Sequence, residues 1–234
     1  MKTLVLVSHP EYNDSMTEAF LKQSQSDLKD VDWVVLDQLN HQPSFDVEKE
    51  QHRWLQYDRI ILQFPMYWYS APALMKQYED DVFTRNFIYA DRHGWLNGKE
   101  LGIVTTLGDP EKDYQVGGRE GFSISELLKP YQAVAQKAGM KFLKPFVVSQ
   151  FAYMTVKDKK ELLVSYRNYL TNEDFDSFKS KQVWYIEQLK QINSELPEDK
   201  QLSMQILIDY IQDNYDQLDE LHWELEMIKK EEDE

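Results

Sequence analysis

The sequence predicts a doubly wound α/β fold, in which a five-stranded parallel sheet in the order 2-1-3-4-5 carries an acidic helical C-terminal extension. Short apolar runs alternate with helical patterns five times, which is typical of a parallel sheet with helices on both faces. Right-handed crossovers and short connections make 2-1-3-4-5 the natural order for five strands. Beyond residue 154 the strand patterns stop and only helical patterns follow.

The first strand is expected at Thr3–Val7, a continuous apolar run of the kind buried on both faces of a sheet. A turn-rich segment, Ser8–Ser15, leads into a helical pattern from Met16 to Leu28. The N-terminus of such a helix attracts phosphate through its free N–H groups and its dipole. The segment lacks the glycine fingerprints of dinucleotide and P-loop sites, so taken alone it is explained better by helix capping.

The second and third strands are expected at 33–36 and 59–64, joined by a loop over 37–45 and a short helix over 47–57. The fourth strand is expected at 100–105. These three strands and the first one make up most of the sheet.

The loop after the third strand holds three consecutive aromatic residues, Tyr67, Trp68 and Tyr69, between Pro65 and Pro72. The prolines restrict the backbone, so we expect a stiff loop that presents flat side chains. Ligands of open α/β sheets bind outside the carboxyl ends of the strands. Stacking on a flat ligand and simple packing in the core are the two competing interpretations of these rings.

A polar, glycine-rich segment over 106–122 follows the fourth strand and is expected to be irregular. A single helix is predicted over 123–138, with Ser123 and Glu126 as a capping box, before a fifth strand at 142–148. In the predicted order, the loops after the first, third and fourth strands meet at one edge of the sheet.

Composition excludes several classes of function. The net charge of −15 argues against nonspecific binding to nucleic acid or to anionic membranes. No window approaches about eighteen apolar residues and no signal peptide precedes the first strand, so a cytoplasmic protein is expected. Cysteine is absent, and redox chemistry therefore requires a bound cofactor. The five histidines are scattered without ligand spacing, so no metal is expected.

We expect two parts, a sheet-forming domain over 1–154 and an acidic helical extension over 155–234, packed on the domain or at a dimer interface. Residues 154–234 hold 20 of the 41 Asp and Glu residues but 10 of the 26 Lys and Arg residues. Helices are expected at about 158–170, 175–194 and 201–230. The last has one apolar stripe and one acidic face, which is typical of a solvated packing helix; an arm for a partner or a dimer is the alternative.

Three motifs in the first 153 residues carry a family resemblance. They are Val5–Pro10 with Ser15; Phe64–Pro72 followed by Leu74, Lys76, Asp81–Phe83 and Tyr89; and Gly98–Lys99 leading to Thr105–Gly108. Together they resemble the flavodoxin-2 group of NAD(P)H:quinone oxidoreductases, which includes the ancillary flavoproteins of glutathione-gated potassium-efflux systems. The resemblance implies a flavodoxin-like fold, a noncovalent flavin (FMN, with FAD as the alternative) and a homodimer with its active site near the subunit interface.

The resemblance also implies which residues hold the flavin. The phosphate and ribityl chain would be surrounded by His9, Ser15, Met16 and Thr17. The isoalloxazine would be lined by Pro65, Met66, Tyr67, Trp68 and Tyr69. Its ring edge would be reached by Thr105, Thr106, Leu107 and Gly108.

The chain departs from the family pattern at several places, among them Tyr67, where many relatives have glutamine. Leu107 stands where many relatives have glycine, and its side chain is expected to narrow the ring-edge pocket or to redirect the backbone. Some relatives have a histidine shortly before the Gly121–Phe122 position, where this chain has Arg119 and Glu120. Tyr114, as a hydroxyl donor, and Arg119, as a positive charge near the flavin, are therefore the candidate catalytic residues.

The function implied by the resemblance is that of a flavin-dependent NAD(P)H:quinone oxidoreductase with ping-pong kinetics. A hydride passes from the nicotinamide to the flavin, and a quinone-like acceptor then binds in the same pocket. The alternative is a regulatory flavoprotein that binds a partner, such as an ion-efflux system, with reductase activity secondary. A single-electron flavodoxin is a third interpretation.

Overall fold

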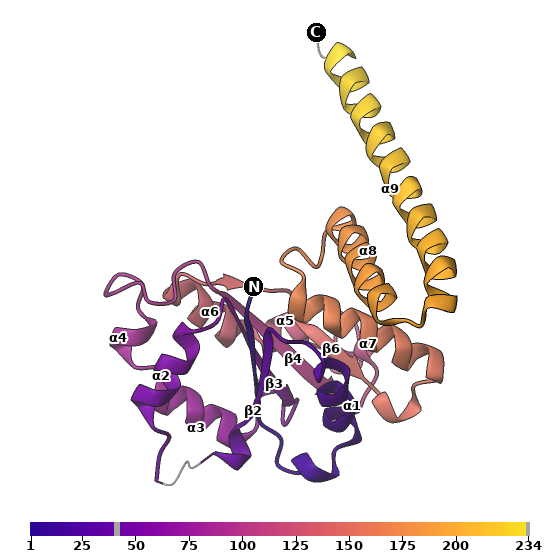
Figure 1. Cartoon of the computed structure of the whole chain (residues 1–234). Helices are drawn as coiled ribbons and strands as arrows, with labels where there is room; N and C mark the ends of the chain where they lie inside the picture. The colour runs from indigo at the N-terminus through magenta and orange to yellow at the C-terminus, as the bar shows by residue number, and fades with distance from the viewer. Residues whose placement is uncertain (40–42, 233–234) are drawn as a thin grey trace. The chain divides into compact units, whose positions relative to one another are not determined.

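The computed structural model describes residues 1–39 and 43–232, so part of the loop expected over 37–45 lies outside the described residues. The chain forms two compact units, Met1–Thr171 and Asn172–Glu234. Figure 1 shows the first unit as a sheet flanked by helices and the second as helices alone.

The first unit is built on a parallel sheet in the order β2-β1-β3-β4-β5, with β6 also paired to β4, which confirms the predicted order. The strands are β1 (Thr3–Val7), β2 (Val31–Val35), β3 (Arg59–Pro65), β4 (Glu100–Leu107), β5 (Lys141–Phe142) and β6 (Phe146–Ser149). Every residue of β1 and β3 is buried, as expected for strands covered on both faces.

The predicted fifth strand is split in two. Lys141–Phe142 pairs with the start of β4, and Phe146–Ser149 pairs with its end. Between the two ladders the edge strand has one residue more than β4, and Pro145 lacks the N–H that a continuous ladder needs.

Helices cover both faces of the sheet. They are α1 (Met16–Gln25), α2 (Val47–Leu55), α3 (Ala73–Val82), α4 (Arg85–Ile88), α5 (Ile124–Leu127), α6 (Lys129–Ala138) and α7 (Val156–Thr171). Short 3₁₀ turns lie at η1 (Tyr12–Asp14), η2 (Leu36–Gln38), η3 (Glu111–Asp113) and η4 (Phe151–Tyr153). One face packs Leu62 of β3 into a cluster with Trp54, Tyr78 and Tyr131 of α2, α3 and α6. The other face is covered by α1 and α7, which contact each other.

The helix predicted over 123–138 is also split, into α5 and α6. The capping box of Ser123 and Glu126 is present at the start of α5. Pro130 lies in the first turn of α6, where a missing N–H costs nothing, whereas inside one continuous helix its ring would clash with the preceding turn.

Helix α7 belongs to the first unit. The Thr3 hydroxyl donates to the Leu170 carbonyl at 2.7 Å, the Arg59 guanidinium donates to the Tyr169 carbonyl, and Tyr166 is fully buried. The compact unit therefore extends to Thr171, beyond the boundary expected at residue 154, because the inner face of α7 completes the cover of the sheet.

The second unit consists of α8 (Phe178–Glu195) and α9 (Glu198–Glu232), joined at Leu196 and Pro197. The two helices lie side by side as a hairpin. Among the described residues, no helix combines the length and apolar character needed to cross a membrane.

Candidate active site

The loops that follow β1, β3 and β4 begin side by side at the carboxyl edge of the sheet. The N–H of Ser8 donates to the Gln63 carbonyl at 3.0 Å, and the N–H of Met66 donates to the Thr106 carbonyl at 3.0 Å. The predicted convergence of the three loops is therefore confirmed, at the edge where ligands of such sheets bind.

The N-terminus of α1 provides an anion site at this edge. Ser15 is the N-cap, and its hydroxyl accepts the N–H of Glu18 at 3.3 Å. The N–H groups of Met16 and Thr17, at the first two helical positions, have no acceptor within the helix. Met16 is exposed and Thr17 is half-buried, so both amides lie near the surface, where the helix dipole favours a phosphate.

His9 is held in one tautomer. Its Nδ1 accepts the N–H of Glu11 at 3.1 Å, so in the neutral ring the proton is on Nε2, which can donate to an anion. Burial lowers the pKa of His9, although Asp37 and Glu11 act in the opposite direction. The backbone N–H of His9 donates to the Asp37 carboxylate at 3.1 Å.

Asp37 was not singled out in the sequence. It follows β2, whose carboxyl end lies beside that of β1, so the strand order was the available signal. Because Asp37 occupies the N–H of His9, the anion-binding groups that remain are the His9 Nε2 and the first amides of α1.

The aromatic loop is a tight turn with a strained backbone. Tyr67 and Ser70 exchange two backbone hydrogen bonds, of 2.8 and 2.9 Å. Between them, Trp68 and Tyr69 have φ angles of +48° and +63°, in the left-handed region. Large residues seldom adopt this conformation, and it persists at functional sites where the surroundings enforce it.

The three rings are not packed in the core. Trp68 is 94% exposed, Tyr67 is 40% exposed and Tyr69 is 47% exposed. The strained backbone therefore holds flat side chains in solvent, at the same edge of the sheet as the N-terminus of α1, and this favours the ligand-stacking interpretation over core packing.

A charged cluster connects the aromatic turn to the segment after β4. The Tyr69 hydroxyl donates to Glu120 at 2.9 Å, and this bond raises the pKa of Tyr69. Arg119 lies 2.7 Å from Asp109, 3.5 Å from Asp113 and 3.4 Å from Glu120. The charge of Arg119 is thus already balanced by carboxylates. Glu120, which the sequence did not single out, links the aromatic turn to the segment after β4.

Tyr114 lies partly buried against the apolar core in the same segment. Burial, followed by the charges of Glu120 and Asp109, raises its pKa, so its hydroxyl keeps its proton at neutral pH and can donate. The start of the segment is fixed by Ser149, whose hydroxyl accepts the N–H of Glu111 at 3.1 Å and donates to the Asp109 carbonyl at 2.9 Å.

The end of β4 alternates between core and edge. Thr105 and Leu107 are buried, while Thr106 is half-buried and Gly108 is exposed. The expectation that Leu107 narrows the pocket or redirects the backbone is wrong, because β4 continues regularly through Leu107 and its side chain packs in the core. A side chain at Gly108 would meet nothing within 4 Å, so open space lies beside its backbone.

A buried polar network lies beneath the N-terminus of α1. The Gln63 amide donates to Glu18 at 2.5 Å and accepts the Tyr166 hydroxyl at 2.7 Å. The second Glu18 oxygen is buried and has no hydrogen-bond partner among the described residues. Burial raises the pKa of Glu18 to about 7.

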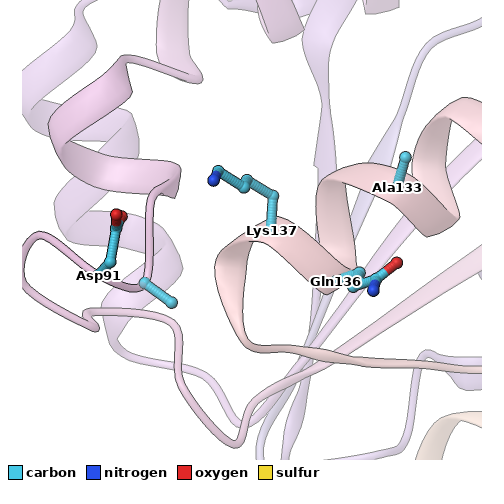
Figure 2. A pocket seen from close by; sticks show the side chains of 5 residues that line it. Asp91, Ala133, Gln136 and Lys137 are labelled. Atoms are coloured by element: carbon cyan, nitrogen blue, oxygen red, sulfur yellow. The ribbon is translucent and has the colours of Figure 1, made fainter.

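A pocket of about 450 Å³ lies at another place in the first unit. Figure 2 shows side chains that line it. It is lined by Ala90, Asp91, Ala133, Gln136 and Lys137. The Lys137 ammonium also lies 4.2 Å from the centre of the Tyr89 ring. Because this pocket lies between the segment before β4 and the end of α6, it faces the amino ends of the strands and is separate from the three loops.

The donors at the carboxyl edge fit a phosphorylated ligand with a flat ring system. Helix amides and a neutral histidine suit the phosphate, and the aromatic turn suits the ring. Of the thirteen residues expected to bind it, His9, Ser15, Met16, Thr17, Pro65, Met66, Tyr67, Trp68, Tyr69, Thr106 and Gly108 lie in or directly before these loops. The other two, Thr105 and Leu107, have buried side chains.

Comparison with known proteins gives a consistent result. A family model described as a flavodoxin-like fold matches residues 1–171, which are also the residues of the first compact unit. The curated protein "Uncharacterized NAD(P)H oxidoreductase YrkL" of Bacillus subtilis is 43% identical over 171 residues, 71% of this chain and 97% of the relative. The ancillary protein KefG of a glutathione-regulated potassium-efflux system, from Serratia proteamaculans, is 34% identical over 70% of this chain and 88% of its own.

Two solved structures are similar to the first unit. An NADPH-quinone reductase from P. pentosaceus is 45% identical, with a TM-score of 0.69, and the match covers 74% of this chain and 99% of that one. A general stress protein 14 from Treponema denticola, solved in complex with FMN, is 27% identical, with a TM-score of 0.64, and covers 73% and 96%.

Proposed function

The chain belongs to the family with the flavodoxin-like fold, and from this premise we propose that it is a cytoplasmic, flavin-dependent NAD(P)H:quinone oxidoreductase. The observation that carries the proposal is the strained aromatic turn at the same sheet edge as a helix N-terminus, because this pair matches a flat ring joined to a phosphate. The quinone reductase and NAD(P)H oxidoreductase names of the similar proteins support the reaction class.

We propose FMN as the cofactor, with NAD(P)H as the electron donor. The similar structure with bound FMN supports this choice over FAD. When bound, the flavin supplies two-electron transfer between the nicotinamide and a quinone-like acceptor. The protein binds and orients: the amides of Met16 and Thr17 and the Nε2 of His9 hold the phosphate.

The rings of Tyr67 and Trp68 would shape the stacking surface in this proposal, and the open space beside the Gly108 backbone would leave room for the ring edge. Tyr114 and Arg119 are the proposed catalytic residues. The Tyr114 hydroxyl donates a hydrogen bond toward negative charge that develops at the site. Arg119 contributes positive charge once a ligand competes with its carboxylate partners.

The visible spectrum tests the proposal directly. Purified protein, reconstituted with FMN if needed, should be yellow, should bleach when NADPH is added without oxygen, and should recover its colour with a simple benzoquinone. A protein that takes up neither FMN nor FAD would contradict the assignment, and one that binds flavin but is not reduced by NADPH or NADH would be a different kind of flavoprotein.

A pair of tryptophan variants identifies the surface that the ligand uses. We expect Trp68→Ala to weaken FMN binding or quinone turnover by about tenfold, because stacking on an aromatic ring contributes roughly 1–1.5 kcal/mol. Trp95→Ala removes another exposed tryptophan, before β4 at the amino edge, and should leave both unchanged. Flavin fluorescence titration and steady-state kinetics measure the two effects.

The similarity to KefG supports a second candidate function, a regulatory flavoprotein that binds a partner. Two forms of the chain distinguish it: the full chain and one that ends at Thr171. If the shorter form keeps its quinone turnover but loses a partner that the full chain retains, the regulatory function gains support. We also propose that the protein acts as a homodimer.

A further inference from the structure

Helix α9 is much longer than the helix that pairs with it. It has 35 residues and α8 has 18, so at about 1.5 Å per residue α9 extends well past its neighbour. Asn193 contacts Gln205 at 3.2 Å and Lys179 contacts Asp219 at 2.5 Å, as expected for an antiparallel hairpin. Lys179 is the second residue of α8, so the N-terminal end of α8 lies beside Asp219, and α9 continues beyond it (Figure 1).

The side of α9 that faces α8 is apolar and ends with this hairpin. It includes Met204, Ile208 and Tyr215, of which Ile208 is 1% exposed. If α9 served only to pack against α8, its surface after residue 219 would be polar all round. Instead, Leu221, Leu225 and Ile228 follow, each more than half exposed.

These residues continue a second stripe, which we name the outer seam. Its positions are separated alternately by four and three residues: Leu207, Ile211, Asn214, Leu218, Leu221, Leu225 and Ile228. This is the heptad spacing of a coiled coil, kept over three heptads. Leu207 and Leu218 are 46% and 38% exposed, so the seam is open on the side of the helix next to the one that α8 covers.

The one polar member of the seam indicates the kind of partner. Asn214 is exposed and lies in the middle of an otherwise apolar series. Asn214 falls at a core position of the heptad, and a polar side chain there costs stability unless the pairing register lets it meet another polar side chain. A second copy of the chain in parallel register places Asn214 opposite Asn214, where the two amides can hydrogen-bond to each other.

The charges beside the seam select the direction of pairing. With Ile211, Leu218 and Leu225 at heptad position a, Glu224 falls at position g and Lys229 at position e. In a parallel pair, position g contacts position e of the other chain five residues further on, which joins Glu224 to Lys229. An antiparallel pair would instead bring g positions opposite g positions and e positions opposite e positions, so Glu224 would lose Lys229 as its partner.

We propose that the outer seam of α9 pairs with the same seam of a second copy of this chain as a parallel, in-register coiled coil. The seam lies outside residues 1–171, the part that matches the family, so none of its residues is among those proposed to bind the flavin. A different protein with a heptad helix is the other possible occupant, and the tests below distinguish the two.

The absence of cysteine makes a cross-linking test clean. In a parallel coiled coil, the two copies of a seam residue come within the distance that a disulfide bridges, roughly 4.4–6.8 Å between Cα atoms. We expect the full-length variant Leu221→Cys to form a disulfide-linked dimer under mild oxidation. The matched control is Asp216→Cys, at outer position f of the same helix, which should stay unlinked.

A mixture of Leu207→Cys and Leu225→Cys proteins of different mass tests the direction. Parallel pairing gives only like-with-like links, whereas antiparallel pairing about the middle of the seam brings a d position opposite an a position and gives links between positions 207 and 225. Equal linking of Leu221→Cys and Asp216→Cys, or no linking of either in protein whose circular dichroism shows intact helices, would overturn the proposal and leave a foreign helix as the occupant of the seam.

Exchanging the charges gives a second test in solution. Glu224→Lys and Lys229→Glu should each weaken dimerisation by about fivefold, because each puts like charges together twice per dimer. The double variant should return to within about twofold of the original, and Glu220→Lys, at outer position c, should have a smaller effect than Glu224→Lys. Sedimentation analysis measures the dissociation constants. A double variant no tighter than the single ones would contradict the parallel register.

Discussion

At the scale of single residues, the aromatic turn shows that this site is organised at the expense of stability. Two bulky residues in succession, Trp68 and Tyr69, adopt left-handed backbone angles that glycine or asparagine adopts more easily. Trp68 gains nothing from packing in return, since it is almost fully exposed. Such a residue is explained by what it contacts when a ligand is bound.

The strain itself can be measured by comparing two replacements. Trp68→Gly should have a free energy of unfolding higher than that of Trp68→Ala by about 1 kcal/mol, because only glycine enters the left-handed region without cost. Both variants should lose quinone turnover to the same extent. Urea denaturation of the two proteins gives the difference, and an alanine variant as stable as the glycine one would show that the turn is unstrained.

Glu18 is a second residue whose position in the fold costs stability. It is fully buried, and burial raises its pKa from 4.5 to about 7. Between these values the folded protein holds a proton that the unfolded chain has released. The free energy of unfolding should therefore fall as the pH rises from about 4.5 to about 7, and the penalty persists at higher pH.

Glu18→Gln should remove this penalty, since a neutral amide keeps an acceptor for Gln63. At pH 8 the variant should be more stable than the original by about 3 kcal/mol, with the difference vanishing near pH 4.5. Glu161→Gln makes the same change on an exposed side chain of α7 and should leave the pH dependence unaltered. Thermal unfolding over this pH range measures both, and a constant difference would contradict the buried charge.

At the scale of elements, the order of the strands in the sheet could be predicted from the sequence. Whether a given helix or strand is continuous could not. Alternating strand and helix patterns leave few topologies, so the order and the meeting of three loops followed from them. Pro130 interrupts a helix, and Pro145 interrupts a strand, that the hydrophobic periodicity had predicted to be continuous. Likewise, an amphipathic stripe such as that of α7 does not reveal which surface it covers.

The limit of the first unit is testable by shortening the chain. A form that ends at Thr171 should fold and bind FMN, because it keeps the cover of both sheet faces. A form that ends at Met154 loses the buried side chains of α7, among them Tyr166, Tyr169 and Leu170, and should not fold. Circular dichroism and flavin binding report on both forms, and a folded protein ending at Met154 would show that α7 is dispensable.

The hydrogen-bond partners of the site residues were the least predictable feature at this scale. Asp37 and Glu120 bind residues distant in sequence, His9 and Tyr69, and no spacing rule connects such pairs. The inward turn of Leu107 depended on β4 continuing two residues beyond its expected end at Thr105. Each difference arises from tertiary contacts, which a single sequence pattern does not contain.

At the scale of the whole molecule, charge is divided unevenly between the two units. Residues 172–234 hold 18 of the 41 acidic residues and 6 of the 26 basic ones, so the second unit carries a net charge of −12 out of −15. Two extensions that pair must therefore come together against a long-range repulsion, which salt screens.

Salt should accordingly strengthen the dimer of the full chain. Raising the ionic strength from about 0.05 to 0.3 M shortens the range of the repulsion to a few ångströms and should tighten the dissociation constant by several-fold. The contact of Glu224 with Lys229 is weakened at the same time, but it involves few charges. Sedimentation at both salt concentrations measures the change, and looser association at high salt would mean that local ion pairs outweigh the net charge.

The position of the outer seam in the chain also sets an order of events during synthesis. Every strand of the sheet and every helix around it leaves the ribosome before α9 does. The flavodoxin-like unit can therefore complete its own fold while the surface that recruits a second copy does not yet exist. On neighbouring ribosomes of one messenger RNA, unfinished chains are protected from joining prematurely, and assembly begins only with chains whose catalytic unit has already been made.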